Sequence, residues 1–162
     1  MDDGATDFGV VLAIAHATFQ HRLGEHMKSA GFADWAPRHG AVLRVLGEAE
    51  MSLRELAGHL QMTSPGALKL VSLLEQGGLV ERVSAPADRR VRLVRVTDRG
   101  HEALEVARGW HAEFEADLAR RIGLDVVRAA RTVLEDVAHQ APSEVPSLLW
   151  SASATTTPAL RR

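Results

Sequence analysis

Residues 52–100 read SLRELAGHLQMTSPGALKLVSLLEQGGLVERVSAPADRRVRLVRVTDRG, and the order of patterns in this stretch decides the fold. Two short segments with helical periodicity come first and end at Gly77-Gly78. Two short apolar segments follow, joined by an arginine-rich turn, and Thr-Asp-Arg-Gly then opens a longer helix. This order predicts two crossed helices followed by a β-hairpin.

Both short helices begin with recognisable start signals. Ser52, with Glu55 three residues later, forms a capping box, and Thr63 precedes Pro65, which is tolerated in a first helical turn. The second helix is expected to turn one stripe inward: Ala67, Leu70, Val71 and Leu74. Its outer faces keep Ser64, Gly66, Leu68, Lys69, Ser72 and Leu73. A small, partly polar first half suits the major groove of DNA, although an ordinary two-helix corner shows the same pattern.

Arginine dominates the predicted hairpin, whose strands are expected over residues 79–83 and 91–96. Between residues 81 and 99 the local charge balance is +3, in a chain whose net charge is −2. The arginines concerned are Arg82, Arg89, Arg90, Arg92, Arg95 and Arg99. Arginine at a hairpin tip suits the narrow minor groove of DNA, and a solvated edge strand also collects arginines. Any argument for DNA binding therefore depends on this local cluster and not on the net charge.

An ordered set of motifs runs through the same stretch. It comprises Leu56-Ala57, Thr63-x-Pro65, Leu74-Glu75-x-Gly77-Gly78-Leu79-Val80-x-Arg82, Asp88-Arg89-Arg90 and Val96-Thr97-x-x-Gly100. Together these motifs resemble the MarR (multiple antibiotic resistance regulator) family of winged-helix transcription factors. The detailed resemblance covers residues 52–100, and the flanking helices fit it more loosely.

The resemblance implies a role for each matching residue. Asp88 would brace the wing, Arg90 would enter the minor groove and Arg89 would contact the DNA backbone. The recognition-helix contacts would be Thr63, Ser64, Pro65 and Lys69, to which Ser72 is added from the outer face of the same helix. The sequence departs from the family at Gly66, Leu68 and Leu73, where two hydroxyls and a basic residue are usual. Those departures leave the operator sequence open.

The flanking segments predict a mainly α-helical chain with a small β-hairpin wing, a winged helix-turn-helix flanked by long dimerisation helices. The expected parts are a dimerisation helix and loop (1–35), the winged domain (36–100), C-terminal dimerisation helices (101–140) and a flexible tail (141–162). Helical stripes at 7–30, 98–121 and 124–140 carry more apolar surface than a small domain needs, which favours a homodimer. By resemblance, its first and last helices interlock. Two-fold symmetry then predicts a palindromic operator of double-stranded DNA.

An effector site is a further expectation, placed by resemblance near the junction of the dimer helices and the winged domain. Trp35, Arg38 and His39 would suit a small planar anion, with His16 as a fourth candidate. For Trp35 itself, filling of the core or of the dimer interface is the favoured interpretation. The histidines His16, His21 and His26 are spaced by five residues and so do not share one helical face, which disfavours a metal site.

Several functional classes are disfavoured by what the sequence lacks. It has no cysteine for thiol redox sensing, no phosphate loop, no nucleophile motif and no usual metal-ligand spacing, so neither an enzyme nor a cofactor is expected. There is no long apolar run, and the acidic start does not resemble a signal peptide, so a cytoplasmic protein without membrane contact is expected. The leading hypothesis is a repressor released from DNA by a small ligand. The alternatives are a metal-responsive regulator using His16, His111 or other histidines, and a protein-interaction module favoured by the non-polar Gly66, Leu68 and Leu73.

Overall fold

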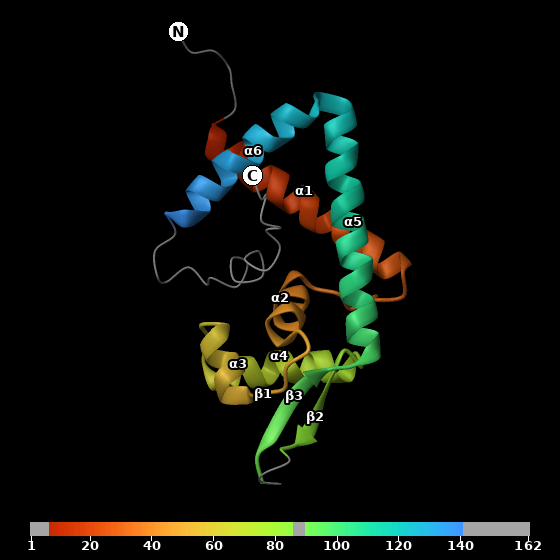
Figure 1. Ribbon diagram of the computed structural model, residues 1–162, viewed down its shortest axis with the longest axis vertical. Coiled ribbons are helices and arrows are strands. Elements are labelled where there is room, and N and C mark those ends of the chain that lie inside the picture. Colours follow the sequence, from red (N-terminus) through yellow and green to blue (C-terminus); the bar gives the residue numbers. More distant parts are fainter. Residues whose placement is uncertain (1–6, 86–89, 141–162) are drawn as a thin grey trace, which may run out of the picture.

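The computed structural model describes residues 7–85 and 90–140 and places a small winged unit below three longer helices (Figure 1). The elements in chain order are α1 (Phe8–Ser29), α2 (Pro37–Leu46), β1 (Met51–Ser52), α3 (Leu53–His59), α4 (Ser64–Gln76), β2 (Val80–Ser84), β3 (Arg92–Val96), α5 (Asp98–Ile122) and α6 (Leu124–His139). The expected mainly helical fold with a small wing is confirmed, and the predicted helix ends lie within one or two residues of those observed.

The wing is a three-stranded antiparallel sheet in the order β1-β3-β2. β2 and β3 pair from Val80 opposite Val96 to Ser84 opposite Arg92. On the other side of β3, Met51 pairs with Val94. Strand β1 has only two residues, too few for an alternating pattern, and it was therefore not predicted.

The predicted helix starts are all present. The Ser52 hydroxyl accepts a hydrogen bond from the Glu55 amide at 3.3 Å, and the Glu55 carboxylate accepts one from the Ser52 amide at 2.8 Å. The Thr63 hydroxyl caps α4 by accepting the Gly66 amide at 3.3 Å. These caps satisfy amides that a helix cannot pair internally.

The core lies where the winged unit meets α1 and the first half of α5. Ala67, Val71 and Leu74 are buried on the inward side of α4, as predicted, and Leu70 is partly buried. The buried residues around them include Leu23, Met27, Leu43, Leu56, Val94, Leu104 and Ala107. The winged unit and the long helices therefore share one hydrophobic core.

Helix α5 is fixed to the wing at its first turn. The Thr97 hydroxyl accepts the Gly100 amide at 3.1 Å and donates to the Gly78 carbonyl at 2.6 Å. A Cβ on Gly100 would lie 2.1 Å from the Leu79 carbonyl oxygen, so only glycine fits there. Helix α5 then continues without a break through Gly109, a residue that could have bent it.

An aromatic cluster joins α1 to the middle of α5. The Phe19 ring lies 5.0 Å from Trp110 and 5.2 Å from Phe114, centroid to centroid, in edge-to-face arrangements. Trp110 and Phe114 stack on each other at 5.1 Å. Such pairs fix the crossing of the two helices. None of the helices within 7–85 and 90–140 combines the length and the apolar character that a membrane crossing requires.

Candidate nucleic-acid interface

The first half of α4 presents an exposed polar surface, and the buried side of the same helix holds that surface in place. Thr63, Ser64, Pro65 and Lys69 are all exposed, in agreement with their predicted outward positions. The Thr63 hydroxyl is engaged as the helix cap, so its hydrogen-bonding capacity toward a ligand is reduced. Ser64 and Lys69 therefore supply the polar side chains of this surface.

Ser72, the fifth residue expected to contact DNA from this helix, has a different environment. It is partly buried, and its hydroxyl accepts a hydrogen bond from Arg82 Nη2 of strand β2 at 3.0 Å. The same guanidinium lies 3.5 Å from the Glu75 carboxylate. Ser72 therefore joins α4 to the wing.

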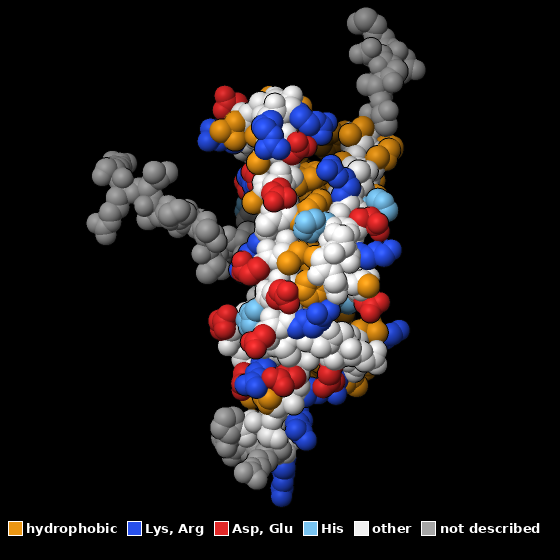
Figure 2. Space-filling model, turned by 90° about the vertical axis from the view of Figure 1, so that its right-hand side faces the viewer, with side chains coloured by type: hydrophobic (Ala, Val, Ile, Leu, Met, Phe, Trp, Pro, Cys, Tyr) orange, Lys and Arg blue, Asp and Glu red, His pale blue; other side chains and the backbone are white. Residues whose placement is uncertain are grey.

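The arginines of the hairpin divide into two groups. Arg90 and Arg92 are exposed, and Arg92 donates to the Ser84 hydroxyl across the hairpin at 3.2 Å. Asp88 and Arg89, the predicted wing support and backbone contact, lie outside the described residues. In Figure 2 blue side chains lie at the lower end of the molecule, beside the hairpin. The exposed basic surface therefore lies at the same end of the molecule as α4.

The remaining arginines of the cluster serve the fold. Arg95 donates to Glu81 at 2.8 Å and lies 3.5 Å from Glu50, so its charge is compensated. Arg99 donates to the carbonyls of Gly77 at 3.3 Å and Gly31 at 2.8 Å, and its guanidinium covers the Phe32 ring. Arg95 and Arg99 are thus engaged within the protein. The positive charge that can contact a DNA phosphate is therefore smaller than the +3 counted along the sequence.

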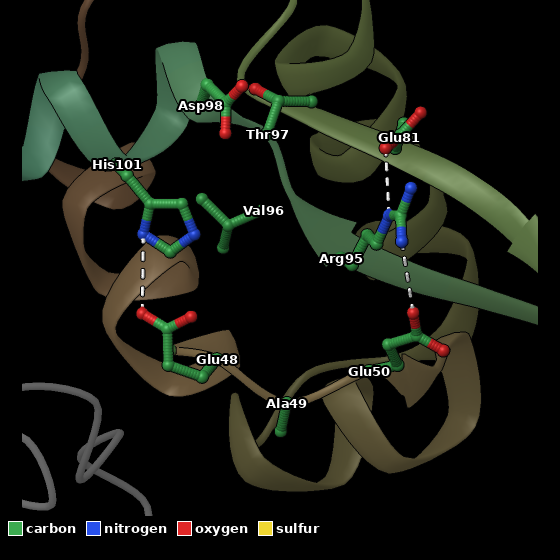
Figure 3. A pocket seen from close by; sticks show the side chains of 10 residues that line it. Glu48, Ala49, Glu50, Glu81, Arg95, Val96, Thr97, Asp98 and His101 are labelled. Carbon is green, nitrogen blue, oxygen red and sulfur yellow. Dashed lines mark hydrogen bonds and ion pairs between the residues drawn. The ribbon is translucent and has the colours of Figure 1, made fainter.

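A hollow of about 460 Å³ lies on the winged unit between the α2–β1 connection, the sheet and the start of α5 (Figure 3). Glu48 faces His101 across it at 3.7 Å, and Glu50 faces Arg95. Glu81 and Asp98 add two further carboxylates to the lining. This largely acidic surface is unsuited to a nucleic-acid backbone.

The four residues expected to form an effector site do not have equivalent environments. His39 is buried, and its Nδ1 accepts the Ala36 amide at 3.2 Å, so it closes a capping box at the start of α2. Burial lowers the pKa of His39, and the nearby Asp34 charge opposes this. Trp35 packs edge-on to His39 at 6.1 Å, whereas Arg38 and His16 are exposed. His39 is therefore a structural residue of the helix start.

A polar cluster that sequence reasoning missed lies beside Trp35. Arg44 Nη2 and Trp35 Cζ2 approach the same face of Gly40, where an added Cβ would meet them at 3.2 and 3.1 Å. Burial lowers the pKa of Arg44, and the Arg108 charge lowers it further. No carboxylate among the described residues lies within ion-pair distance of Arg44. The buried Trp35 Nε1 and His111 Nε2 have no hydrogen-bond partner within that same part of the chain.

Exposed apolar side chains are concentrated at the opposite end of the molecule. At its first turns α1 exposes Phe8, Val10, Val11 and Ile14, and α6 exposes Val126, Val133, Leu134 and Val137. Figure 2 shows orange side chains at the upper end, where α1 begins and α5 turns into α6. Along α6 the positions 126, 130, 133 and 137 fall on one side of the helix, and Val127 is its only described buried residue.

Over residues 7–85 and 90–140, no group of three or more histidine, aspartate or glutamate side chains is arranged to hold a metal ion. His111, one of the histidines named in the alternative metal hypothesis, contacts the rings of Phe19 and Trp110. Burial lowers the pKa of His111, and the Arg44 charge lowers it further.

Comparison with known proteins assigns the winged region of the chain to a family. A family model described as MarR family matches residues 36–91, which span α2 through the hairpin. The winged region of the chain, residues 36–91, belongs to the MarR family. A MarR-type regulator is a transcription factor and not an enzyme, in agreement with the sequence-based expectation.

A curated relative supports this assignment over part of the chain. It is the uncharacterized HTH-type transcriptional regulator YdgJ of Bacillus subtilis (strain 168), 27% identical over 95 residues. The match covers 54% of this chain and 58% of YdgJ, so the chain spans little more than half the length of that relative.

Solved structures share the MarR fold over most of the chain. The S. aureus MepR–DNA complex gives a TM-score of 0.64 at 16% identity, covering 85% of this chain and all of MepR. Streptococcus pneumoniae FabT in complex with DNA gives 0.64 at 18% identity, covering 82% and 96%. The reduced form of MarR from E. coli gives 0.64 at 21% identity, covering 82% and 97%.

Proposed function

We propose that this chain is a homodimeric, sequence-specific DNA-binding regulator that represses transcription and is released from DNA by a small anionic ligand. The observation that carries the DNA-binding part is the exposed N-terminal half of α4 at the same end of the molecule as Arg90 and Arg92. A helix of this kind places small and polar side chains against base edges, while hairpin arginines reach the backbone and minor groove. MepR and FabT, which share the fold, are both described in complex with DNA.

Dimer formation is supported by the apolar surfaces of α1 and α6. Val126, Val133 and Val137 are each about half exposed, although they lie on the apolar side of a helix. Leaving such a surface in water costs about 25 cal/mol for every Å² of apolar area. A second copy of the chain covers it most simply, because a two-fold interface uses the same surface on both partners.

Binding to DNA over a salt series tests the DNA-binding proposal. Duplexes selected from a randomised library by the wild-type chain serve as probes, and fluorescence anisotropy gives the affinity. Replacing Arg90 by alanine is expected to weaken binding to all sequences and to lower the salt slope by about 1, because one phosphate charge is no longer neutralised. Arg120→Ala, on the far part of α5, is the matched control. Failure to enrich any sequence, even at low salt, would overturn the proposal.

The ligand step is supported by Arg44 and its neighbours. Arg44 is a partly buried cation without a carboxylate among the described residues, and Trp35 Nε1 is a buried donor without an acceptor there. A small aromatic carboxylate would pair with the guanidinium and stack on the indole. Its negative charge would also relieve the effect of Arg44 on His111, whose pKa should then rise.

A panel of aromatic carboxylic acids beginning with benzoate tests the ligand step. At least one acid is expected to release the operator duplex from wild-type protein and from Arg38→Gln, but not from Arg44→Gln. Arg38 is the appropriate control because it lies on the same helix and is exposed. If no acid releases DNA, or if Arg38→Gln is the variant that resists release, this assignment is wrong.

A further inference from the structure

Helix α4 leaves two large apolar side chains in solvent, Leu68 at 44% exposed and Leu73 at 48%. Neither contributes to the core, because the buried side of the helix consists of Ala67, Val71 and Leu74. Single exposed leucines are common on protein surfaces and need no function. The positions of these two, however, differ in a way that bears on what α4 recognises.

Leu68 and Leu73 do not form one apolar patch through α4. Five residues separate them, which on a helix is about 7.5 Å along the axis and about 140° around it. A protein partner that docked on α4 through hydrophobic contact would need contiguous apolar area. The separation therefore disfavours the protein-interaction alternative and leaves each leucine to be explained by its own surroundings.

Leu68 lies among polar side chains on the first half of α4. Ser64 precedes it by one helical turn and Ser72 follows it by one turn. Ser72 is tied to strand β2 through Arg82, whereas Ser64 and the adjacent Lys69 remain exposed. Leu68 is the fifth residue of the helix and Leu73 the tenth. In a helix that enters the major groove, the N-terminal residues are the ones that meet base edges.

The major groove has one apolar feature that such a side chain can read, the 5-methyl group of thymine. We infer that Leu68 packs against a thymine methyl in each half-site of the operator. Leu68 has no donor or acceptor with which to read the other base edges, and Lys69 beside it supplies charge for a phosphate. The inference rests on the proposed function and deepens it by naming a specificity-determining residue and the chemical group that it recognises.

Uracil substitution tests this contact directly, because uracil pairs as thymine does but lacks the methyl group. In a duplex selected by the wild-type chain, each thymine is replaced in turn by uracil. At one position per half-site, wild-type affinity is expected to fall about fourfold, the effect of removing one buried methyl group. Leu68→Ala should bind the unmodified duplex more weakly and be indifferent to uracil there. Leu73→Ala, the matched control, should keep the wild-type sensitivity.

A second variant gives an independent test. Leu68→Gln places an amide where the leucine side chain was, and glutamine pairs with the N6 and N7 edge of adenine. A repeated selection with this variant should therefore lose thymine at the sensitive position and gain adenine. Thermal melts of both variants should match wild type, because Leu68 is outside the core.

These experiments distinguish failure of the Leu68–thymine contact from failure of the proposed DNA-binding function. A specific duplex that shows no uracil-sensitive position, or one whose sensitivity persists in Leu68→Ala, would overturn the inference and leave DNA binding intact. An unchanged base preference in Leu68→Gln would do the same. If no duplex is enriched at low salt, the proposed function itself fails and the inference fails with it.

Discussion

Arg82 of strand β2 donates a hydrogen bond from Nη2 to the hydroxyl of Ser72 in α4, over 3.0 Å. The two residues are ten positions apart, and their hydrogen bond fixes the recognition helix relative to the wing. Glu75, at 3.5 Å from the same guanidinium, strengthens the link. The angle between helix and wing thus depends on a partly exposed polar interaction as well as on the core.

Arg82→Ala should therefore lower stability without removing a cation that faces a DNA phosphate. We expect the free energy of unfolding to fall by about 1 kcal/mol, because one partly buried hydrogen bond to a charged group is removed. DNA affinity should fall while the salt slope stays as in wild type. Chemical denaturation and anisotropy measure the two effects. Arg92→Ala should show the opposite combination, so equal salt slopes in the two variants would contradict this assignment.

Gly100→Ala is expected to disrupt the junction of α5 and the wing. The added Cβ would lie 2.1 Å from the Leu79 carbonyl oxygen and 2.6 Å from Val96 Cγ1, and the backbone cannot move aside cheaply. A destabilisation of about 2 kcal/mol or more should appear as a lower Tm. Gly109→Ala is the control, since a Cβ there meets nothing within 4 Å and should stabilise α5 by up to about 1 kcal/mol. A Gly100→Ala variant as stable as wild type would rule out the close approach.

Stability should fall as the pH drops below about 6.5, the ordinary value for histidine. Burial lowers the pKa of both His39 and His111, so the unfolded chain takes up protons at a pH where the folded chain does not. The decrease therefore begins near the unfolded pKa and ends at the lower folded values. Thermal melts between pH 7.5 and 5 measure it.

The contribution of His39 can be isolated by His39→Gln. Glutamine at this third helical position can still accept the Ala36 amide, but it does not titrate. The variant should keep wild-type stability at pH 7.5 and lose part of the pH dependence, with His111 providing the remainder. An unchanged pH profile would show that His39 is not protonated differently in the two states.

Val133→Glu should convert the proposed dimer into a monomer. Val133 is 50% exposed on the apolar side of α6, and a carboxylate buried against a second copy would be costly. Light scattering coupled to size exclusion measures the mass. Thr132→Glu, one residue away on a different side of α6, adds the same charge and should remain dimeric. A Val133→Glu chain that is still dimeric would place the interface elsewhere.

Local signals in the sequence predicted the helices and the inward side of α4. Capping residues such as Ser52 and Thr63 act on amides three positions away, so their role is visible in sequence. Strand β1 was missed because only its pairing with β3 defines it. Capping residues and helical periodicity thus predicted the helices, whereas strand β1, which is defined by its pairing with the distant β3, was not predicted.

The site was predictable to a smaller extent, for the same reason. Arg95 and Arg99 looked like surface charges, yet their partners Glu50 and Gly31 lie 45 and 68 positions away. Arg44 sits among apolar residues of α2, and its burial depends on how α5 packs. The ligand-binding role expected of His39 stays a prediction; the structure adds that its Nδ1 accepts the amide of Ala36, three residues earlier, at the start of α2.

Because α5 is one continuous helix, a change of its tilt at one end displaces the other end. Its 25 residues extend about 37 Å, and its first turn is locked to the wing through Thr97 and Gly100. A tilt of about 10° at one end would displace the other by about 6 Å over that length. In the proposed dimer, a modest change in how the upper helices pack would therefore displace each hairpin by about the 6 Å width of the minor groove.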